Sequence, residues 1–189
     1  MNPVELTATA ATIASVLLTV RRSLWQYPIG ILATALFFVV FQQAHLYASA
    51  GLQIIFMGVQ IYGWWFWLHG DSGKRPRIRS WSTRLVLAVC LVATVGGMAS
   101  AFALGRLTDA QLPLADSLIL GLSLSAQFLL DRKIIQHWAV WVVVNILSIV
   151  VYGSQGLTVT AWLYAGLLLN TGWGWWVWRR AARSTEVLV

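Results

Sequence analysis

Two long stretches of the chain, residues 23–70 and 134–178, contain no aspartate, glutamate, lysine or arginine. Each stretch is long enough to cross a lipid bilayer twice, because a spanning helix needs about 20 mostly apolar residues. Hydrophobic residues make up 59% of the 189 residues and charged residues only 10%. A soluble domain of this length cannot bury that much apolar surface. The chain is therefore predicted to fold in a membrane.

Polar breaks divide the chain into seven apolar segments of roughly the length that a membrane-spanning helix needs. In hydrocarbon every backbone N–H and C=O group must be paired within the protein, and segments of this length achieve that as helices rather than as short barrel strands. We predict a single all-α transmembrane domain over residues 1–189. Its seven spans are Glu5–Val20, Leu24–Phe41, His45–Leu68, Arg84–Leu104, Leu114–Leu130, Ile134–Tyr152 and Leu157–Trp178.

The basic residues predict the orientation of these spans, because lysine and arginine in short loops stay on the cytoplasmic side. Twelve of the 13 basic residues follow spans one, three, five or seven, which all end on the same side of the membrane. Only Arg106 lies in a loop on the other side. The N-terminus is therefore expected outside and the C-terminus in the cytoplasm. The net charge of +7 is explained by this topology and by contact with anionic lipid, so no nucleic-acid partner is needed.

An internal repeat relates the first three spans to the last three. Adding 111 to a residue number places Arg21-Arg22 on Arg132-Lys133 and the segment Tyr62–Trp67 on Trp173–Trp178. Three helices end on the opposite side of the membrane from where they start. Two such triplets can therefore have the same orientation only if an odd number of spans lies between them. We expect a first repeat over residues 5–68, a connecting helix over 84–104 and a second repeat over 114–178. Parallel repeats of this kind are typical of transporters that hold their substrate at mid-membrane between the repeats.

Neutral polar residues, rather than charged ones, lie deep inside the predicted spans. Buried carboxylates usually mark proton relays, and none lies deep in a span, which favours an uncoupled mechanism. Asn145 and Asn170 fall near the middle of spans six and seven, while Gln60 and Gln127 lie nearer the cytoplasmic ends of theirs. Each amide needs partners for its oxygen and its nitrogen. Those partners come either from neighbouring helices or from a ligand.

Tryptophans accompany these amides. Trp138 and Trp141 share one helix face with Asn145, and Trp173 follows three residues after Asn170. Flat rings combined with amides suit a planar heterocycle with a hydrogen-bonding tail, and indole faces also attract a cationic ring. The tryptophans before the cytoplasmic charges favour a different interpretation, anchoring at the membrane interface. They are Trp64, Trp65, Trp67, Trp175, Trp176 and Trp178.

The order of these motifs resembles the PnuC family of bacterial vitamin transporters. The resemblance is carried by Gln60–Trp64 in the first repeat and, in the second, by Gln127, Asp131–Lys133, Trp138–Trp141, Asn145, Tyr164 and Asn170–Gly174. It implies a SWEET-like fold of three, one and three helices, a homotrimer in the bacterial inner membrane, and import of nicotinamide riboside by facilitated diffusion. It also implies substrate contact by Gln127, Trp138, Trp141, Asn145, Asn170 and Trp173, with Gln60 and Trp64 as gating or first-repeat contacts.

Other cargoes and other classes of protein stay open at this stage. Members of the same family look specialised for thiamine or riboflavin, and a sugar carrier of the SWEET type would have the same fold. An enzyme would need a cluster of reactive side chains inside the membrane, which the spans lack. Cys90 is the only cysteine, which excludes an intrachain disulfide and a cysteine metal site. We expect no cofactor and no metal.

Overall fold

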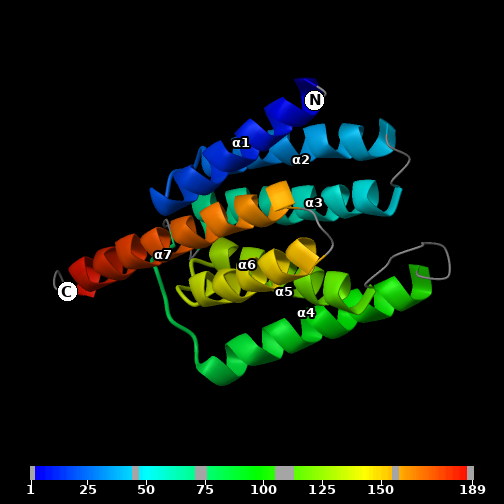
Figure 1. Cartoon of the computed structure of the whole chain (residues 1–189). Coiled ribbons are helices and arrows are strands. Elements are labelled where there is room, and N and C mark those ends of the chain that lie inside the picture. The colour runs from blue at the N-terminus through cyan, green and yellow to red at the C-terminus, as the bar shows by residue number, and fades with distance from the viewer. Residues whose placement is uncertain (1–2, 44–46, 71–75, 105–112, 155–157, 187–189) are drawn as a thin grey trace. The chain divides into compact units, whose positions relative to one another are not determined.

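The computed structural model describes residues 3–43, 47–70, 76–104, 113–154 and 158–186, and Lys74, Arg75 and Arg106 lie outside these ranges. The described residues form seven α-helices and confirm the all-α prediction (Figure 1). Predicted span ends lie within three residues of the helix ends, except that the last helix continues to Glu186. The helices are α1 (Pro3–Val20), α2 (Gln26–Gln43), α3 (Tyr47–His69), α4 (Thr83–Leu104), α5 (Pro113–Asp131), α6 (His137–Ser154) and α7 (Thr158–Glu186).

The helix lengths match the thickness of a bilayer. The helices contain between 18 and 29 residues, so at about 1.5 Å per residue each reaches roughly 27 Å or more, against a hydrocarbon core of about 30 Å. By length and apolar composition alone, one helix of the described residues, α1, qualifies for a full crossing, and α2, α4, α5 and α6 contain shorter apolar stretches.

Prolines mark where several of these helices begin. Pro3 and Pro113 are the first residues of α1 and α5, and Pro28 is the third residue of α2. Backbone N–H groups in the first turn have no partner within the helix, so a residue without an N–H costs nothing there. The ring of proline also fixes φ near the helical value. These positions start the helices without interrupting them.

The chain divides into two compact units. The first contains Met1–Arg77 together with Asp131–Lys133, and the second contains Ile78–Leu130 and Ile134–Val189. Within the first unit α2 packs against both α1 and α3, and within the second unit α6 packs against α7 (Figure 1). The helix predicted to connect the repeats, α4, groups with the second unit. The first unit also takes in the last residue of α5 and the two residues after it.

The same turn ends α1 and α5. Arg22 and Lys133 adopt left-handed backbone conformations, with φ of 54° and 53°. The N–H of the next residue then bonds to a carbonyl five residues back, over 3.0 Å from Ser23 to Leu18 and over 2.8 Å from Ile134 to Leu129. This is a Schellman cap, which normally has glycine at the left-handed position. Corresponding residues differ by 111, so the repeat extends to the backbone hydrogen bonds of this turn.

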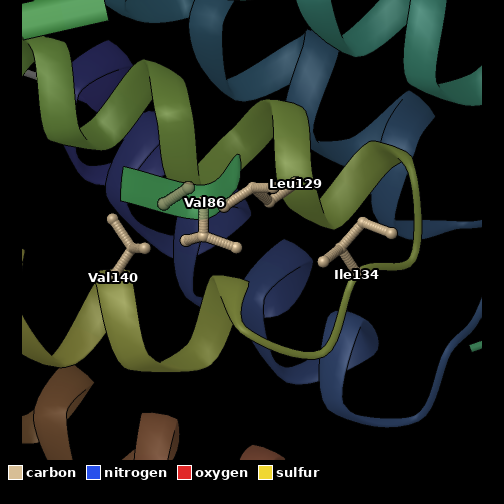
Figure 2. Close-up of a cluster of buried hydrophobic side chains, with 5 residues drawn as sticks. Val86, Leu129, Ile134 and Val140 are labelled. Atoms are coloured by element: carbon tan, nitrogen blue, oxygen red, sulfur yellow. The ribbon is translucent and has the colours of Figure 1, made fainter. Parts of the chain in front are cut away.

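A hydrophobic cluster holds α4, α5 and α6 together in the second unit. Figure 2 shows side chains from these helices and from the turn before α6 pointing toward one another. Beside it, the segment before α4 pairs with that turn, because Ile135 N–H donates to the Arg79 carbonyl over 2.9 Å. The cluster therefore fixes which side of α6 faces inward. Its members are Val86, Ala126, Leu129, Ile134 and Val140.

Two glycines bring the backbones of α4 and α5 into contact. A Cβ on Gly97 would lie 3.3 Å from the Ser117 carbonyl oxygen, and a Cβ on Gly121 would lie 2.8 Å from the Thr94 backbone nitrogen. Small residues of this kind let membrane helices approach closely. Gly97 of α4 and Gly121 of α5 therefore lie at the contact between the two helices.

Replacing Gly121 by alanine tests this contact. A methyl group there overlaps the α4 backbone, so Gly121→Ala is expected to cost about 1–3 kcal/mol of stability. Gly96→Ala is the matched control, because Gly96 is exposed on α4 with nothing within 4 Å of its Cβ position. The control should unfold no earlier than the unsubstituted protein, since alanine favours helix. Thermal unfolding in detergent measures both; equal midpoints would contradict the close contact.

Candidate functional site

The predicted site residues divide unequally between the two units. Six of the eight lie on α5, α6 and α7 of the second unit, and the other two lie on α3 of the first. Each group is described within its own unit. The six are Gln127, Trp138, Trp141, Asn145, Asn170 and Trp173, and the two are Gln60 and Trp64.

A stripe of four side chains runs along the inward side of α6. Trp138, Trp141, Asn145 and Ser148 follow one another at intervals of three or four residues, which places them on one helix face. Three of them are almost fully buried: Trp138 is 3% exposed, Asn145 2% and Ser148 0%. Trp141 is half-buried and packs against the hydrophobic cluster. The stripe therefore faces the interior of the second unit.

Asn145 uses part of its amide to join α6 to α7. Its Nδ2 donates to the hydroxyl of Thr171 over 3.1 Å. That hydroxyl in turn donates to the Leu167 carbonyl over 2.8 Å, so the partner is held in one orientation. Interhelical bonds of this kind are common in membrane proteins. The sequence left two roles open for Asn145, joining helices and binding a ligand. In the structure its amide nitrogen joins two helices.

Asn170 differs, although it lies directly beside Thr171 on α7. Both its Nδ2 and its Oδ1 are buried, and neither has a hydrogen-bond partner within the part of the chain that the structure describes. An unpaired buried amide costs several tenths to several kcal/mol, according to how dry its surroundings are. A ligand that offers both a donor and an acceptor would remove this cost. Asn170 is therefore the strongest candidate for ligand contact in the second unit.

Trp138 lies in an aromatic cluster with His137 and Trp178. Its ring meets that of Trp178 edge to face, with centroids 5.8 Å apart at 82°, and the His137 ring lies 4.8 Å from Trp178. Gly174 makes room for the Trp138 ring, because a Cβ there would lie 2.6 Å from Cζ2. Trp138 thus supports the packing of α6 on α7. Its Nε1 is buried and has no partner among the described residues.

The first unit repeats this cluster 111 residues earlier. Tyr27 and Trp67 meet edge to face with centroids 5.4 Å apart at 79°, and Gly63 again leaves space beside them. Here the cluster surrounds Asp131, which is fully buried. The Tyr27 hydroxyl donates to its Oδ1 over 3.0 Å, and Trp67 Nε1 donates to its backbone carbonyl over 2.9 Å. The repeats share the ring geometry, and the first unit adds a carboxylate.

Basic residues beside Asp131 lie over aromatic rings of α3. The Lys133 Nζ is 4.0 Å from the centroid of the Trp67 ring, and the Arg132 guanidinium carbon is 4.7 Å from that of Phe66. Cation–π contacts of this kind contribute about 0.5–1 kcal/mol when exposed and more when dry. They complete the attachment of residues 131–133 to the first unit.

The tryptophans expected at the membrane interface fall into two groups. Trp64, Trp65 and Trp176 expose 37%, 56% and 54% of their surface, whereas Trp67 and Trp178 expose 2% and 0%. Interface anchoring is therefore wrong for the buried pair, whose rings fill the interior of their units. A glycine four residues before each buried ring, on the same helix face, is the signal in the sequence that distinguishes this pair.

Gln60 and Gly30 show how the first unit differs from the second. The Gln60 amide oxygen lies against Gly30 of α2, where a Cβ would overlap it. Gly30 is the repeat counterpart of Trp141. At this position of the repeat the first unit has a glycine covered by a glutamine side chain, whereas the second unit has an indole. Gln127 is half-buried on α5. Trp64 and Trp173 expose 37% and 45% of their surface.

Comparisons with known proteins identify the family and the fold. A family model described as nicotinamide mononucleotide transporter matches residues 2–180. The nicotinamide riboside transporter PnuC of Escherichia coli is 28% identical, over 96% of this chain and 87% of its own. The riboflavin/roseoflavin transporter RibM of Streptomyces davaonensis is also 28% identical, over 88% and 80%. The crystal structure of the vitamin B3 transporter PnuC matches with a TM-score of 0.74 at 23% identity, over 97% of this chain and 84% of that one, which shows a common fold.

The glycine beneath Trp138 tests the aromatic cluster. Gly174→Ala places a methyl group inside the Trp138 ring, and we expect it to cost about 1–3 kcal/mol and to change the tryptophan fluorescence. Gly172→Ala on the same helix is the control, because no atom lies within 4 Å of its Cβ position. If both variants unfold at the same temperature with the same spectrum, Trp138 is not held by Gly174.

Proposed function

Since this chain belongs to the nicotinamide mononucleotide transporter family, we propose that it imports nicotinamide riboside by facilitated diffusion. Membership makes it a multi-pass membrane transporter of vitamin-like small molecules and not an enzyme. The cargo and the mechanism are the proposal. The observation that carries it is Asn170, whose buried amide has no partner among the described residues and lies on the helix next to the α6 stripe.

The chemistry of the second unit fits a flat ring with polar substituents. Trp141 offers an indole that is half-buried, and stacking or cation–π attraction on indole holds a planar or cationic ring. Asn170 offers one acceptor and two donors, which match an amide on such a ring. The indole N–H of Trp138 is a further donor. Nicotinamide riboside combines a cationic ring, an amide and a sugar, so it satisfies each of these groups.

Sequence and geometry favour transport without ion coupling. Residues 134–178, which contain α6 and nearly all of the apolar part of α7, have no acidic or basic side chain apart from His137. Its Nδ1 lies 2.8 Å from the Ile134 carbonyl at the start of α6. Proton-coupled carriers place carboxylates or histidines along the substrate path. We infer that the substrate moves down its own gradient.

Riboflavin is the second candidate cargo, because the Streptomyces davaonensis relative is a riboflavin/roseoflavin transporter at the same 28% identity as the nicotinamide riboside transporter. A flavin also stacks on indole and carries amide-like groups. Its ring system is larger and neutral, and its tail is a ribityl chain. Thiamine and a hexose are further compounds to compare in the transport experiment described below.

Orientation and assembly extend the proposal. The basic residues that follow α1 and α5, together with those in the last turns of α7, support an N-terminus outside and a C-terminus in the cytoplasm, by the positive-inside rule. The resemblance to the PnuC family supports a homotrimer in the bacterial inner membrane. Both proposals rest on the sequence. Labelling of the termini tests the orientation, and the mass of the detergent-solubilised protein tests the homotrimer.

Vesicles that contain only this protein test the transport proposal. Labelled nicotinamide riboside should equilibrate across the membrane without a proton or sodium gradient, and an excess of unlabelled riboside outside should reduce its entry. Protein-free vesicles are the control, and riboflavin, thiamine and a hexose are tested in parallel. Uptake that needs either ion gradient would contradict the uncoupled mechanism. Transport of another compound in place of the riboside would replace the cargo.

Asn170→Ala tests the binding role of the unpaired amide. We expect about a 10- to 100-fold loss of riboside affinity, as for one or two hydrogen bonds, with no loss of thermal stability because no bond within the described residues is broken. Leu169→Ala is the control, since the neighbouring Leu169 is 79% exposed and should bind normally. Unchanged affinity in Asn170→Ala, measured by calorimetric titration, would assign Asn170 to packing.

A further inference from the structure

Ser148, the twelfth of the 18 residues of α6, has a buried hydroxyl without a hydrogen-bond partner in the described part of the chain. Its side chain is 0% exposed, and its Oγ has no hydrogen-bond partner among the described residues. A hydroxyl transferred into an apolar interior without a partner destabilises the fold. Neither the sequence motifs nor the family resemblance drew attention to this residue.

Other helical hydroxyls in this chain avoid that cost by bonding to their own helix. Thr12 donates to the Ala8 carbonyl over 2.9 Å, and Ser125 donates to the Gly121 carbonyl over 2.8 Å. This bond to the carbonyl four residues back is the usual solution for serine and threonine inside helices. Ser148 makes no such bond to Val144. Its hydroxyl therefore lacks the bond that its own helix could supply.

The position of Ser148 continues the α6 stripe beyond Asn145. Seven residues separate it from Trp141, which is close to two helical turns, so the two side chains project in nearly the same direction. Asn145 lies between them, and Ser148 is about 4.5 Å further along the helix axis than Asn145. Along one face, α6 thus presents an aromatic ring, an amide and then a free hydroxyl.

The hydroxyl occurs in only one of the two repeats. The residue 111 positions before Ser148 is Phe37, and the counterpart of Trp141 is Gly30. The first repeat therefore lacks both the indole and the hydroxyl at these two positions. A hydroxyl needed only for helix packing would have no reason to accompany the indole in one repeat. The joint occurrence supports a role shared by Ser148 and Trp141.

We propose that Ser148 binds a hydroxyl of the sugar-like tail of the cargo. The inference rests on the proposed function, which places the flat ring of the substrate at Trp141. A tail that extends along α6 past Asn145 then reaches Ser148. A serine hydroxyl both donates and accepts, which suits the neighbouring hydroxyls of a ribose or a ribityl chain equally. Ser148 is accordingly a specificity residue that selects vitamins with a hydroxylated tail over their bare rings.

Ser148→Ala separates this role from a structural one, because the two predict changes of opposite kind. Removal of an unpaired buried hydroxyl should leave the thermal stability of the substrate-free protein equal or higher. The same change should weaken binding of nicotinamide riboside, or of riboflavin if that is the cargo, by roughly tenfold. Binding of the matching ring-only compound, nicotinamide or lumichrome, should not change. Calorimetric titration of the purified full-length protein measures each affinity.

Ser125→Ala is the matched control, because it removes a buried hydroxyl that is paired within α5. It should lower stability and leave the affinity unchanged. Ser148→Cys, which keeps the shape of the side chain with a somewhat larger atom and weakens the hydrogen bond, serves as a second variant and should lose affinity in the same direction as Ser148→Ala.

Three results distinguish the possible failures. Equal riboside affinity in Ser148→Ala and the unsubstituted protein would overturn the inference and leave the proposed function standing. An equal loss for the riboside and for nicotinamide would also overturn it, because the hydroxyl would then act on the ring. If the unsubstituted protein binds none of the tested vitamins, the proposed function fails, and the role of Ser148 fails with it.

Discussion

The structure depends on one constraint: a polar group that is buried among apolar helices must find a partner, since no water is present to supply one. Most groups do so locally. Threonine and serine hydroxyls bond back to their own helices, Asn145 bonds to Thr171, and Asp131 receives the Tyr27 hydroxyl and is packed beside Trp67. Within the described residues, buried groups without a partner include the Asn170 amide on α7 and the Trp138 indole nitrogen and Ser148 hydroxyl on α6, and His137 Nε2 and Gln26 Nε2 are others. The first three belong to the helices that carry most of the predicted site, and they are the groups that we expect a ligand to complete.

The two repeats use one framework for different purposes. Both place a glycine beneath an aromatic pair that meets edge to face, and both end their first helix with the same left-handed cap. The contents of the framework then diverge. In the first unit Gln60 covers Gly30, and the aromatic pair donates hydrogen bonds to Asp131. In the second unit Trp141 stands at the position that corresponds to Gly30, and the Asn170 amide and Ser148 hydroxyl have no partner among the described residues. The shared framework thus carries different side chains in the two units.

Much of the fold was predictable from sequence, because the cost of charge in lipid separates the spans so clearly. The gaps in charge located the helix ends to within three residues, apart from the end of α7, where the helix continues through Arg179, Arg180 and Arg183. The burial of Trp67 and Trp178 was not predicted. A tryptophan that precedes basic residues gives the same sequence pattern whether its ring lies at the membrane interface or in the protein core. Ser148 was missed for a related reason. Whether a helical hydroxyl bonds to its own backbone depends on its rotamer and neighbours, and the sequence specifies neither.

A structure of the full-length protein with nicotinamide riboside bound tests the central claim most directly, because it shows what completes the unpaired groups. The account predicts the ring of the riboside against Trp141, the Asn170 amide within hydrogen-bond distance of the ligand, and a ribose hydroxyl at Ser148 Oγ. A ligand held elsewhere, with the Asn170 amide and the Ser148 hydroxyl paired to protein groups, would contradict it.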